Sequence, residues 1–171
     1  MRLKSRSYLG AVVLAFLSAV SVAVAAQPDV AKLMTQQTAA VIYGLPVLPG
    51  RPELIGQMGG HSIRFDGAEP VGTLDVGGVE IGVMDTRQVA EGASLPPQQI
   101  FDIAAKQPEP GRTIEALQGL GQEAIYAVKD KEKSVFVLSG VKILIVSVIS
   151  SKNPGAKAAL TQAATAALLK I

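Results

Sequence analysis

The sequence predicts an α/β fold of the α+β kind, with a mainly antiparallel sheet between helical layers. Residues 119–149 contain three strand-like segments separated by tight turns, and strands joined in this way pair antiparallel. Two of these segments, 135–138 and 141–149, scarcely alternate between polar and apolar residues, which is typical of strands covered on both faces. An alanine-rich helical periodicity at the end of the chain supplies one of the covering layers.

Residues 1–25 have the pattern of a cleavable secretory signal. A positive start, an apolar stretch at 9–19 and a run of small residues follow one another in the order that a signal peptidase reads. We expect cleavage near Ala25–Ala26, which leaves one domain, residues 26–171, in the periplasm or secreted. The basic residues at the start of this pattern are Arg2, Lys4 and Arg6. The alternative is an uncleaved membrane anchor, because the apolar stretch is close to the length of about 20 residues that spans a bilayer.

The composition of the mature chain excludes several classes of partner. Removal of the signal leaves 13 basic and 14 acidic residues, a formal charge of −1, which argues against nucleic acid as a partner. We expect membrane contact only transiently, through the signal peptide. The chain has no cysteine, so a lipid anchor on cysteine, a disulfide and thiol chemistry are excluded, and stability must come from burial.

The first half of the mature chain is predicted to hold one helix and three strands. Thr35 is a suitable N-cap for a helix over 36–43, which Gly44 ends, and an earlier turn at 30–34 can pack on the same core. Three prolines make 45–52 extended rather than helical. Strands are expected at three segments, with Gly77-Gly78 joining the last two as a hairpin that has one half-exposed face. These segments are 61–65, 71–76 and 79–85.

The second half is predicted to continue with a helix, up to four strands and a last helix. After a loop at 86–94, two prolines begin a helix at 97–106, followed by a strand at 113–117. Asn153 is the expected N-cap of the terminal helix, with Pro154 in its first position. A leucine in place of Ala163 is expected to overpack the buried stripe of that helix. The expected stripe of the earlier helix is Ile100, Phe101, Ile103 and Ala104, and that of the last is Ala156, Ala159, Leu160, Ala163, Ala164, Ala167, Leu168 and Ile171.

Several of these segments together resemble a known group of proteins. They are the helix end at 39–47, the turn at 119–124, the hairpin at 136–140, the strand at 143–148 and the alanine-rich last helix. Their order is similar to that in small exported bacterial proteins of uncharacterised function with an α/β/α sandwich like that of the Mog1 and PsbP proteins. The resemblance implies the same sandwich fold and a role as a binding or accessory module. Related proteins often carry a pair of cysteines near the first helix and first strand, which this chain lacks.

Candidate catalytic residues are few. His61 is the only histidine, so any Ser–His–acid arrangement would have to use it. Ser62 is its neighbour on a strand, and neighbours on a strand point to opposite faces. The other serines considered lie in strands or turns without a nucleophile-elbow pattern. These other serines are Ser134, Ser139 and Ser147. We interpret His61 as an exposed polar residue beside a Gly-Gly turn.

No metal, cofactor or phosphate site is predicted. Several carboxylates fall in the first strand region, but their spacing matches no calcium loop, and we interpret them as solvated charges at a sheet edge. Gly119-Leu120-Gly121 lacks the third glycine and the helix of a phosphate loop, so a strand turn is expected, in which Gly121 needs positive φ or close backbone approach. The carboxylates of the first strand region are Asp66, Glu69, Asp75, Glu80 and Asp85. Elsewhere, the stretch at 129–133 carries charges of both signs and is predicted to be a solvated turn.

Three functions remain open from the sequence. The first is an exported non-catalytic binding or accessory module of the periplasm, whose partner is an unknown protein or small molecule. Its contacts would lie on the loops at 45–52 and 86–97, which are otherwise plain connectors. The alternatives are a hydrolase-like enzyme that uses His61 with a nearby carboxylate, and a membrane-anchored protein with an uncleaved signal.

Overall fold

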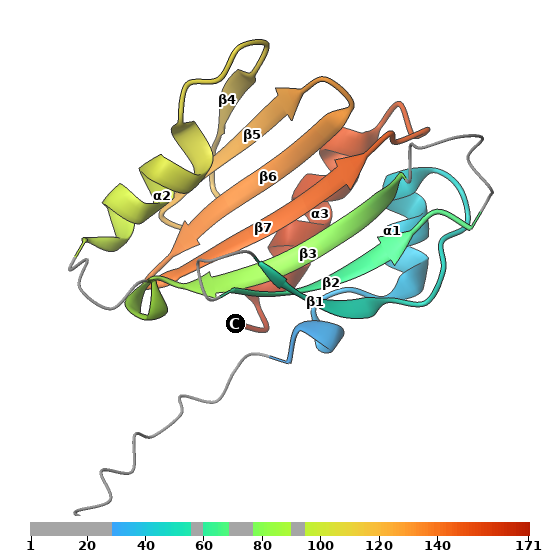
Figure 1. The fold of residues 1–171 in the computed structure, drawn as a ribbon, viewed down its shortest axis with the longest axis horizontal. Coiled ribbons are helices and arrows are strands. Elements are labelled where there is room, and N and C mark those ends of the chain that lie inside the picture. Colours follow the sequence, from blue (N-terminus) through green and yellow to red (C-terminus); the bar gives the residue numbers. More distant parts are fainter. Residues whose placement is uncertain (1–28, 56–59, 69–76, 90–94) are drawn as a thin grey trace, which may run out of the picture.

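The structure, a computed structural model, describes residues 29–55, 60–68, 77–89 and 95–171. Within them, the α-helices and strands follow in the order one helix, three strands, one helix, four strands and one helix (Figure 1), and the first of these strands is not one that the sequence predicted. The strands form a seven-stranded sheet in the order β1-β2-β3-β7-β6-β5-β4, and every neighbouring pair is antiparallel. The mixed α/β class and the antiparallel sheet are therefore confirmed. The predicted signal at 1–25 lies outside the described residues.

The strands are β1 Arg51–Ile55, β2 Gly60–Asp66, β3 Gly78–Asp85, β4 Thr113–Leu117, β5 Glu123–Lys129, β6 Glu132–Ser139 and β7 Lys142–Ile149. The α-helices are α1 Gln36–Tyr43, α2 Pro97–Lys106 and α3 Ala156–Leu168, and two short 3-10 helices are η1 Val30–Lys32 and η3 Thr86–Gln88. None of the helices in this described part is long and apolar enough to cross a membrane.

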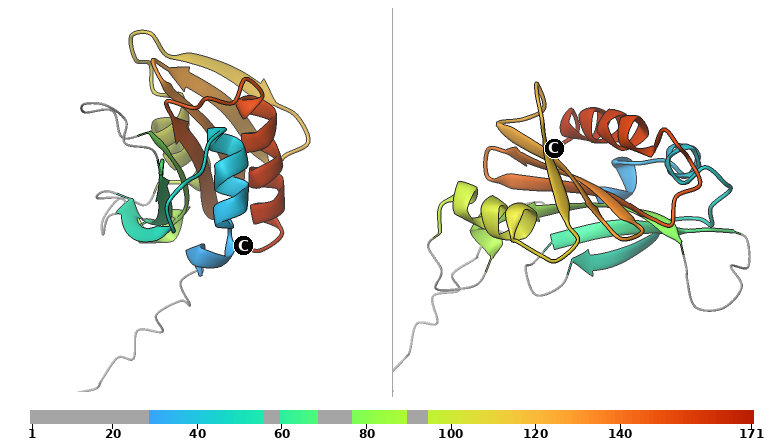
Figure 2. Two further views of the ribbon diagram at one scale, coloured as in Figure 1. Left: turned by 90° about the vertical axis from the view of Figure 1, so that its right-hand side faces the viewer. Right: turned by 90° about the horizontal axis from the view of Figure 1, so that it is seen from above.

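The helices lie on both faces of the sheet. α1 and α3 pack on one face, here called the α1/α3 face, and α2 packs on the other, the α2 face (Figure 2). On β7, Leu144, Val146 and Val148 point to the α1/α3 face, because their strand partners belong to the cluster beneath these helices. Ile143 points to the α2 face and is fully buried there. The result is three layers, with the sheet in the middle.

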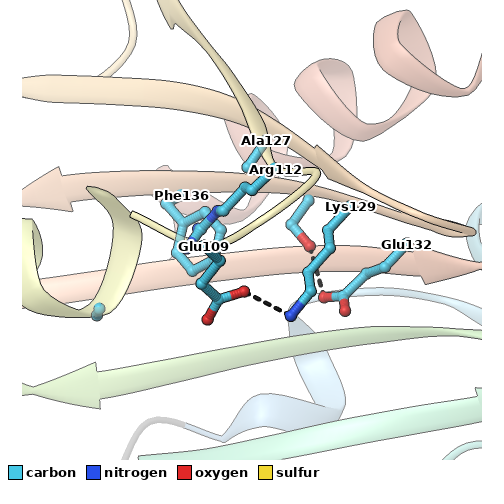
Figure 3. A pocket seen from close by; sticks show the side chains of 8 residues that line it. Glu109, Arg112, Ala127, Lys129, Glu132 and Phe136 are labelled. Atoms are coloured by element: carbon cyan, nitrogen blue, oxygen red, sulfur yellow. Dashed lines mark hydrogen bonds and ion pairs between the residues drawn. The ribbon is translucent and has the colours of Figure 1, made fainter. Parts of the chain in front are cut away.

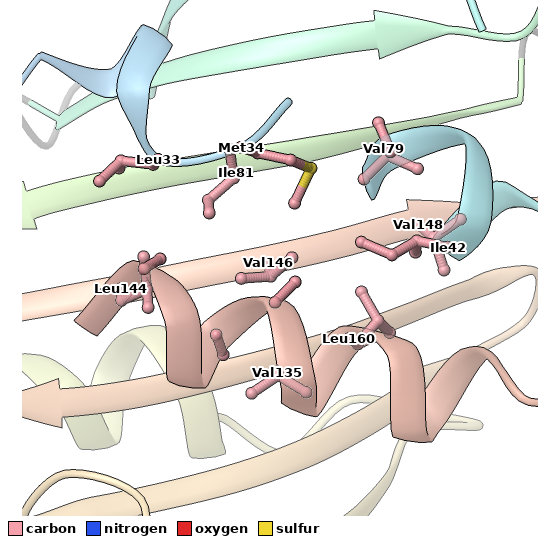
Figure 4. Packing of buried hydrophobic residues seen from close by; sticks show 14 of the residues in the cluster. Leu33, Met34, Ile42, Val79, Ile81, Val135, Leu144, Val146, Val148 and Leu160 are labelled. Atoms are coloured by element: carbon pink, nitrogen blue, oxygen red, sulfur yellow. The ribbon is translucent and has the colours of Figure 1, made fainter. Parts of the chain in front are cut away.

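The α1/α3 face holds the larger hydrophobic core (Figure 4). Three central strands contribute alternate aliphatic residues, and Leu160 of α3 and Ile42 of α1 close over them. Leu33 and Met34 follow η1 and are buried in the same core, as the predicted early turn requires. α3 presents alanines to the sheet, which lets its backbone approach closely. The predicted stripe is confirmed, with Ala156, Leu160, Ala163, Ala164 and Ala167 buried and Ala159, Leu168 and Ile171 packed against them.

The α2 face has a smaller core that covers only one end of the sheet. Ile100 and Phe101 of α2 pack with Met84 of β3 and Ile143 of β7. Further along β7 on the same face, Ile145, Ser147 and Ile149 are only partly buried. The prediction that both faces of the last two strands are covered is thus confirmed at the α2 end. At the other end, no helix of the described residues covers this face, and it carries polar residues. The site described below lies there.

α1 is capped at both ends, and its C-terminal end is hydrogen-bonded to the segment that precedes α3. Thr35 caps α1 as predicted, its hydroxyl accepting from the Thr38 N–H at 3.1 Å, and Gly44 ends the helix with a left-handed φ of 89°. The last carbonyls of α1 would otherwise lack partners. They accept from the segment before α3: Val41 O from Asn153 Nδ2, Ile42 O from Ser151 Oγ and Tyr43 O from Lys152 N, at 2.7–2.9 Å.

The first half contains one strand that the sequence did not predict. Residues 45–52 were expected to be extended, and Arg51 and Pro52 at their end begin β1, an edge strand that pairs with β2. Proline is tolerated there because an edge strand leaves one row of N–H groups unused. The predicted strand at 71–76 lies outside the described residues. β3 was expected to pair with that segment, but on its two edges β3 pairs with β2 and β7.

Three smaller expectations also differ from the structure. β3 was expected to have one half-exposed face, yet Gly82 and Met84 are buried on the α2 face. Ile103, expected in the buried stripe of α2, is 53% exposed, and Ala105 takes its place. α3 begins at Ala156 with Gly155 as its N-cap, two residues later than predicted, because Asn153 Oδ1 instead accepts from the Gly155 N–H in a turn.

A leucine at Ala164 of α3 should destabilise the fold more than one at Ala163. Ala164 is fully buried, so the larger side chain should overpack the core and cost about 1–3 kcal/mol. Ala163 borders a shallow groove of about 330 Å³ between α1 and α3, which offers a leucine some room. The free energy of unfolding from denaturant titration measures both effects, with the exposed Ala158→Leu as control. Equal stability of all three variants would mean that α3 does not rest on the sheet.

Candidate functional site

A pocket lies on the α2 face, where α2 ends and the sheet is left open (Figure 3). Its volume is about 250 Å³. We call it the two-turn pocket, because two tight turns supply its charged residues. It is lined by Ala104, Glu109, Arg112, Ala127, Lys129, Glu132, Ser134 and Phe136.

The first turn joins α2 to β4 and carries Glu109 and Arg112. Pro110 and Gly111 occupy its two central positions, and the Arg112 N–H donates to Glu109 O at 3.1 Å. Gly111 has a φ of 76°, so the turn has the residues that a type II turn requires. The prolines on either side of Glu109 stop α2 from continuing. This local sequence therefore places an acidic and a basic side chain at the two ends of one turn.

The second turn joins β5 to β6 and carries Lys129 and Glu132. These two residues are the last paired positions of the hairpin, and Asp130 between them adopts a φ of 52°. Aspartate tolerates the left-handed region better than most residues, which suits a two-residue hairpin loop. The prediction of a turn within 129–133 is confirmed. Lys129 and Glu132 are exposed, as expected for a solvated turn, and both also line the pocket.

The floor of the pocket is the sheet itself. Ala127, Ser134 and Phe136 project to the α2 face from adjacent strands, and the strand register pairs Ala127 with Ser134. Ser134 is only 3% exposed, and its hydroxyl donates to Glu132 Oε1 at 2.9 Å. The same row of the sheet continues across β7 and β3 with Ser147 and Glu80. The floor thus consists of two small side chains, one of them the polar Ser134, beside the aromatic ring of Phe136.

Arg112 is held in place above this floor. Its guanidinium carbon lies 5.6 Å from the centre of the Phe136 ring, within range of a cation–π interaction. Its Nη2 donates to Ala105 O at 2.7 Å, close to the end of α2, and its Nη1 makes a longer bond of 3.4 Å to Gln107 O. A guanidinium has more N–H donors than these bonds use. Arg112 is therefore a fixed cation with donors to spare.

An ion pair connects the two turns. Lys129 Nζ donates to Glu109 Oε2 at 2.6 Å, although the two residues are twenty positions apart in the sequence. The hydrogen bond from Lys129 lowers the pKa of Glu109, and the bond to Glu109 raises the pKa of Lys129. Both shifts keep the pair charged at neutral pH. The side chains are 44% and 37% exposed, and such exposed pairs contribute little to stability.

His61 does not belong to this pocket. It lies on β2, where its strand partners Leu54 and Val83 place it on the α1/α3 face, opposite to the pocket. Ser62 points to the α2 face, as predicted from strand alternation. His61 is half-buried rather than exposed, which corrects the expectation from the sequence. Ser134 and Ser147 lie on the α2 face, and Ser139 lies on the α1/α3 face at the end of β6.

Among the described carboxylates that were considered as metal ligands, no three converge. Asp66 forms ion pairs with Arg51 at 3.1 Å and Arg64 at 2.8 Å, and the hydrogen bond that Arg64 donates to Asp66 raises the pKa of Arg64. Asp85 lies at the other end of the sheet, where its bond to Arg87 lowers its pKa. No group of three or more acidic, histidine or cysteine residues in the described part is placed to hold a metal ion. Glu69 and Asp75 lie outside the described residues.

The other sequence features serve the framework. The turn at Gly119-Leu120-Gly121 leads into β5, a strand, as expected, and Gly121 has a φ of 63°. In the loop at 45–52, Val47 bridges to Gly67 and Leu48 N donates to Asp66 O. The loop at 86–97 begins with η3, where Thr86 Oγ1 donates to Val141 O at 2.8 Å. These described parts of both loops are anchored to the sheet.

Comparison with known proteins returns no relative: no family model, no curated protein and no solved structure matches this chain.

Proposed function

We propose that the protein is an exported, non-catalytic binding module of the periplasm, with the two-turn pocket as its ligand site. The observation that carries this proposal is the set of polar and charged side chains in the pocket. A fixed arginine, a lysine, two carboxylates and a buried serine converge on a concave part of an otherwise open sheet face. A concave site with a few convergent polar groups is the usual form of a small-molecule site.

Placement of the side chains supports binding rather than catalysis. Hydrolysis by a Ser–His–acid set needs the imidazole within hydrogen-bond reach of the nucleophile. His61 and Ser134 lie on opposite faces of the sheet, so they do not meet. The pocket residues instead bond to one another and to backbone carbonyls. We therefore propose no enzymatic activity and no cofactor for this chain.

We further propose that the fold is the Mog1/PsbP-like sandwich. Three layers, a seven-stranded antiparallel sheet and an alanine-rich terminal helix support this assignment. Because fold alone is a weak guide to activity, the binding role rests on the pocket.

Native mass spectrometry of protein purified from its own periplasm tests the proposal. We expect the mass of residues 26–171 together with a bound small molecule. An Ala104→Trp variant should lose that molecule, since the indole fills the pocket, whereas Ala166→Trp in the groove between α1 and α3 should retain it. A bound molecule lost only from Ala166→Trp, or none in the wild-type protein, would contradict the proposed site. A mass that includes residues 1–25 would contradict signal cleavage.

A further inference from the structure

The ion pair between Lys129 and Glu109 is the outer part of the two-turn pocket. Both side chains are partly exposed, whereas Ala127 and Ser134 beneath them are 4% and 3% exposed. Figure 3 shows Glu109 with Arg112 and Phe136 on one side and Lys129 with Glu132 on the other, so the ion pair crosses from one turn to the other. A ligand that enters between the turns has to separate these two charges.

Separation of the pair restricts the charge of the ligand. A monoanion would bond to Lys129 but place a second negative charge beside Glu109, and a monocation would bond to Glu109 but place a second positive charge beside Lys129. Like charges held this close repel each other, which is unfavourable. A ligand with one carboxylate and one ammonium group replaces both halves of the ion pair.

The rest of the pocket is consistent with the same charge balance. Arg112 supplies further donors on the side of Glu109, and Glu132 supplies a carboxylate on the side of Lys129, where it already accepts from Ser134. Each side therefore presents one positive and one negative group. Ala104, Ala127 and Phe136 form the apolar part of the lining, against which a hydrocarbon group can pack.

The volume limits the ligand to a small molecule. Sites for drug-sized ligands typically occupy ~300–1,000 Å³, and the two-turn pocket has about 250 Å³. That space is suitable for a single amino acid and too small for a peptide held within it.

We propose that the two-turn pocket binds a small zwitterion of the free amino-acid class. The carboxylate bonds to Lys129, the ammonium group bonds to Glu109, and the side chain lies against Phe136. This inference rests on the proposed function, because it assigns a ligand class to that same pocket.

The test compares ligands that differ only in charge. The twenty amino acids are first screened singly by ¹⁵N–¹H NMR titration of residues 26–171. The amino acid that binds best is then compared with its N-acetyl derivative, a monoanion, with its amide, a monocation, and with its N-acetyl amide, which is neutral. We expect the zwitterion to bind at least about tenfold more tightly than each derivative, since each hydrogen bond to a charged group typically contributes this much or more.

Single-charge variants test which residues cause the preference. Glu109→Gln should shift the preference towards the N-acetyl derivative, and Lys129→Gln should shift it towards the amide. Both residues are exposed, so the melting temperature should remain that of the wild-type protein. Glu115→Gln is the matched control, because Glu115 forms an equally short ion pair of 2.6 Å with Lys157 on the α1/α3 face. This control should leave all affinities unchanged.

The outcomes separate this inference from the proposed function. Equal binding of the four compounds, or tighter binding of a singly charged derivative by the wild-type protein, would overturn the zwitterion and leave the pocket as a ligand site. Failure of all twenty amino acids to shift the pocket amides would also overturn it. In that case, a bound molecule that Ala104→Trp removes would still support the proposed function, and its absence would end both.

Discussion

Replacement of Phe101 by alanine should destabilise the protein by about 3–5 kcal/mol, the usual cost of removing a fully buried aromatic side chain. Phe101 is completely buried between α2 and the sheet, where it belongs to the small core with Met84, Leu138 and Ile143. This core attaches α2 to the sheet. Removal of the ring leaves a cavity in it, because neighbouring side chains relax only partly into the space.

Ile103→Ala on the same helix is the matched control. Ile103 is 53% exposed, so its truncation should change stability by less than about 0.5 kcal/mol. Denaturant unfolding followed by circular dichroism gives both values. Equal midpoints for the two variants would show that α2 does not pack on the sheet as described. Because Ala104 of α2 also lines the two-turn pocket, we expect Phe101→Ala to shift the NMR signals of the pocket residues as well.

Replacement of Gly121 by valine should cost about 2–5 kcal/mol, through two separate effects. The backbone at Gly121 has a φ of 63°, where a residue with a Cβ atom loses about 1–2 kcal/mol. A Cβ atom here would also lie 2.5 Å from Leu138 O and 2.6 Å from Val137 Cγ1. Overpacking of this kind typically adds about 1–3 kcal/mol. Leu138 O accepts the Gln122 N–H at 2.8 Å, so the added side chain would disturb this bond between the turn before β5 and the end of β6.

Gly119 offers a control within the same turn. Its φ is 73°, but a Cβ atom there would have no other atom within 4 Å. Gly119→Val should therefore show the backbone strain without the steric clash, and be the milder of the two variants. If both variants melt at the same temperature, close approach at Gly121 contributes nothing, and if Gly121→Val melts with the wild type, the turn itself is not as described.

Local signals in the sequence predicted the helices and strands correctly where these elements depend on residues that are close in the chain. The cap at Thr35, the stop at Gly44 and the prolines before α2 each act on residues within one or two helical turns, and the helix bounds they predict are those observed. The aliphatic runs of β6 and β7 identified the centre of the sheet for a similar reason, since burial on both faces is visible in composition.

Predictions failed where the outcome depends on a distant partner. β1 was missed because Pro52 argues against a strand, and only its position at the edge of the sheet makes proline tolerable. The alternation in β3 indicated a half-exposed face, but Gly82 is covered by the Ile55 side chain and Met84 by α2. Neither cover is visible from the residues of β3 alone.

The two-turn pocket was missed for the same reason. Each turn looks like ordinary solvated sequence, and only the pairing of β5 with β6 and the return of the chain after α2 bring them together. One signal was present in the sequence. Both turns carry opposite charges three positions apart, Glu109 with Arg112 and Lys129 with Glu132, around residues suited to tight turns. Such pairs form an ion-paired pocket only if the two turns are adjacent, which sequence spacing does not reveal.

The most direct measurement of the central claim is an NMR map of where the natural ligand binds. The small-molecule fraction released by heating periplasm-purified protein is added to ¹⁵N-labelled residues 26–171. We predict that the amide signals of residues 104–112 and 127–136 shift, while those around His61 stay in place. Shifts that centre on His61 and Val83, or on the groove between α1 and α3, would contradict the assignment of the two-turn pocket as the binding site.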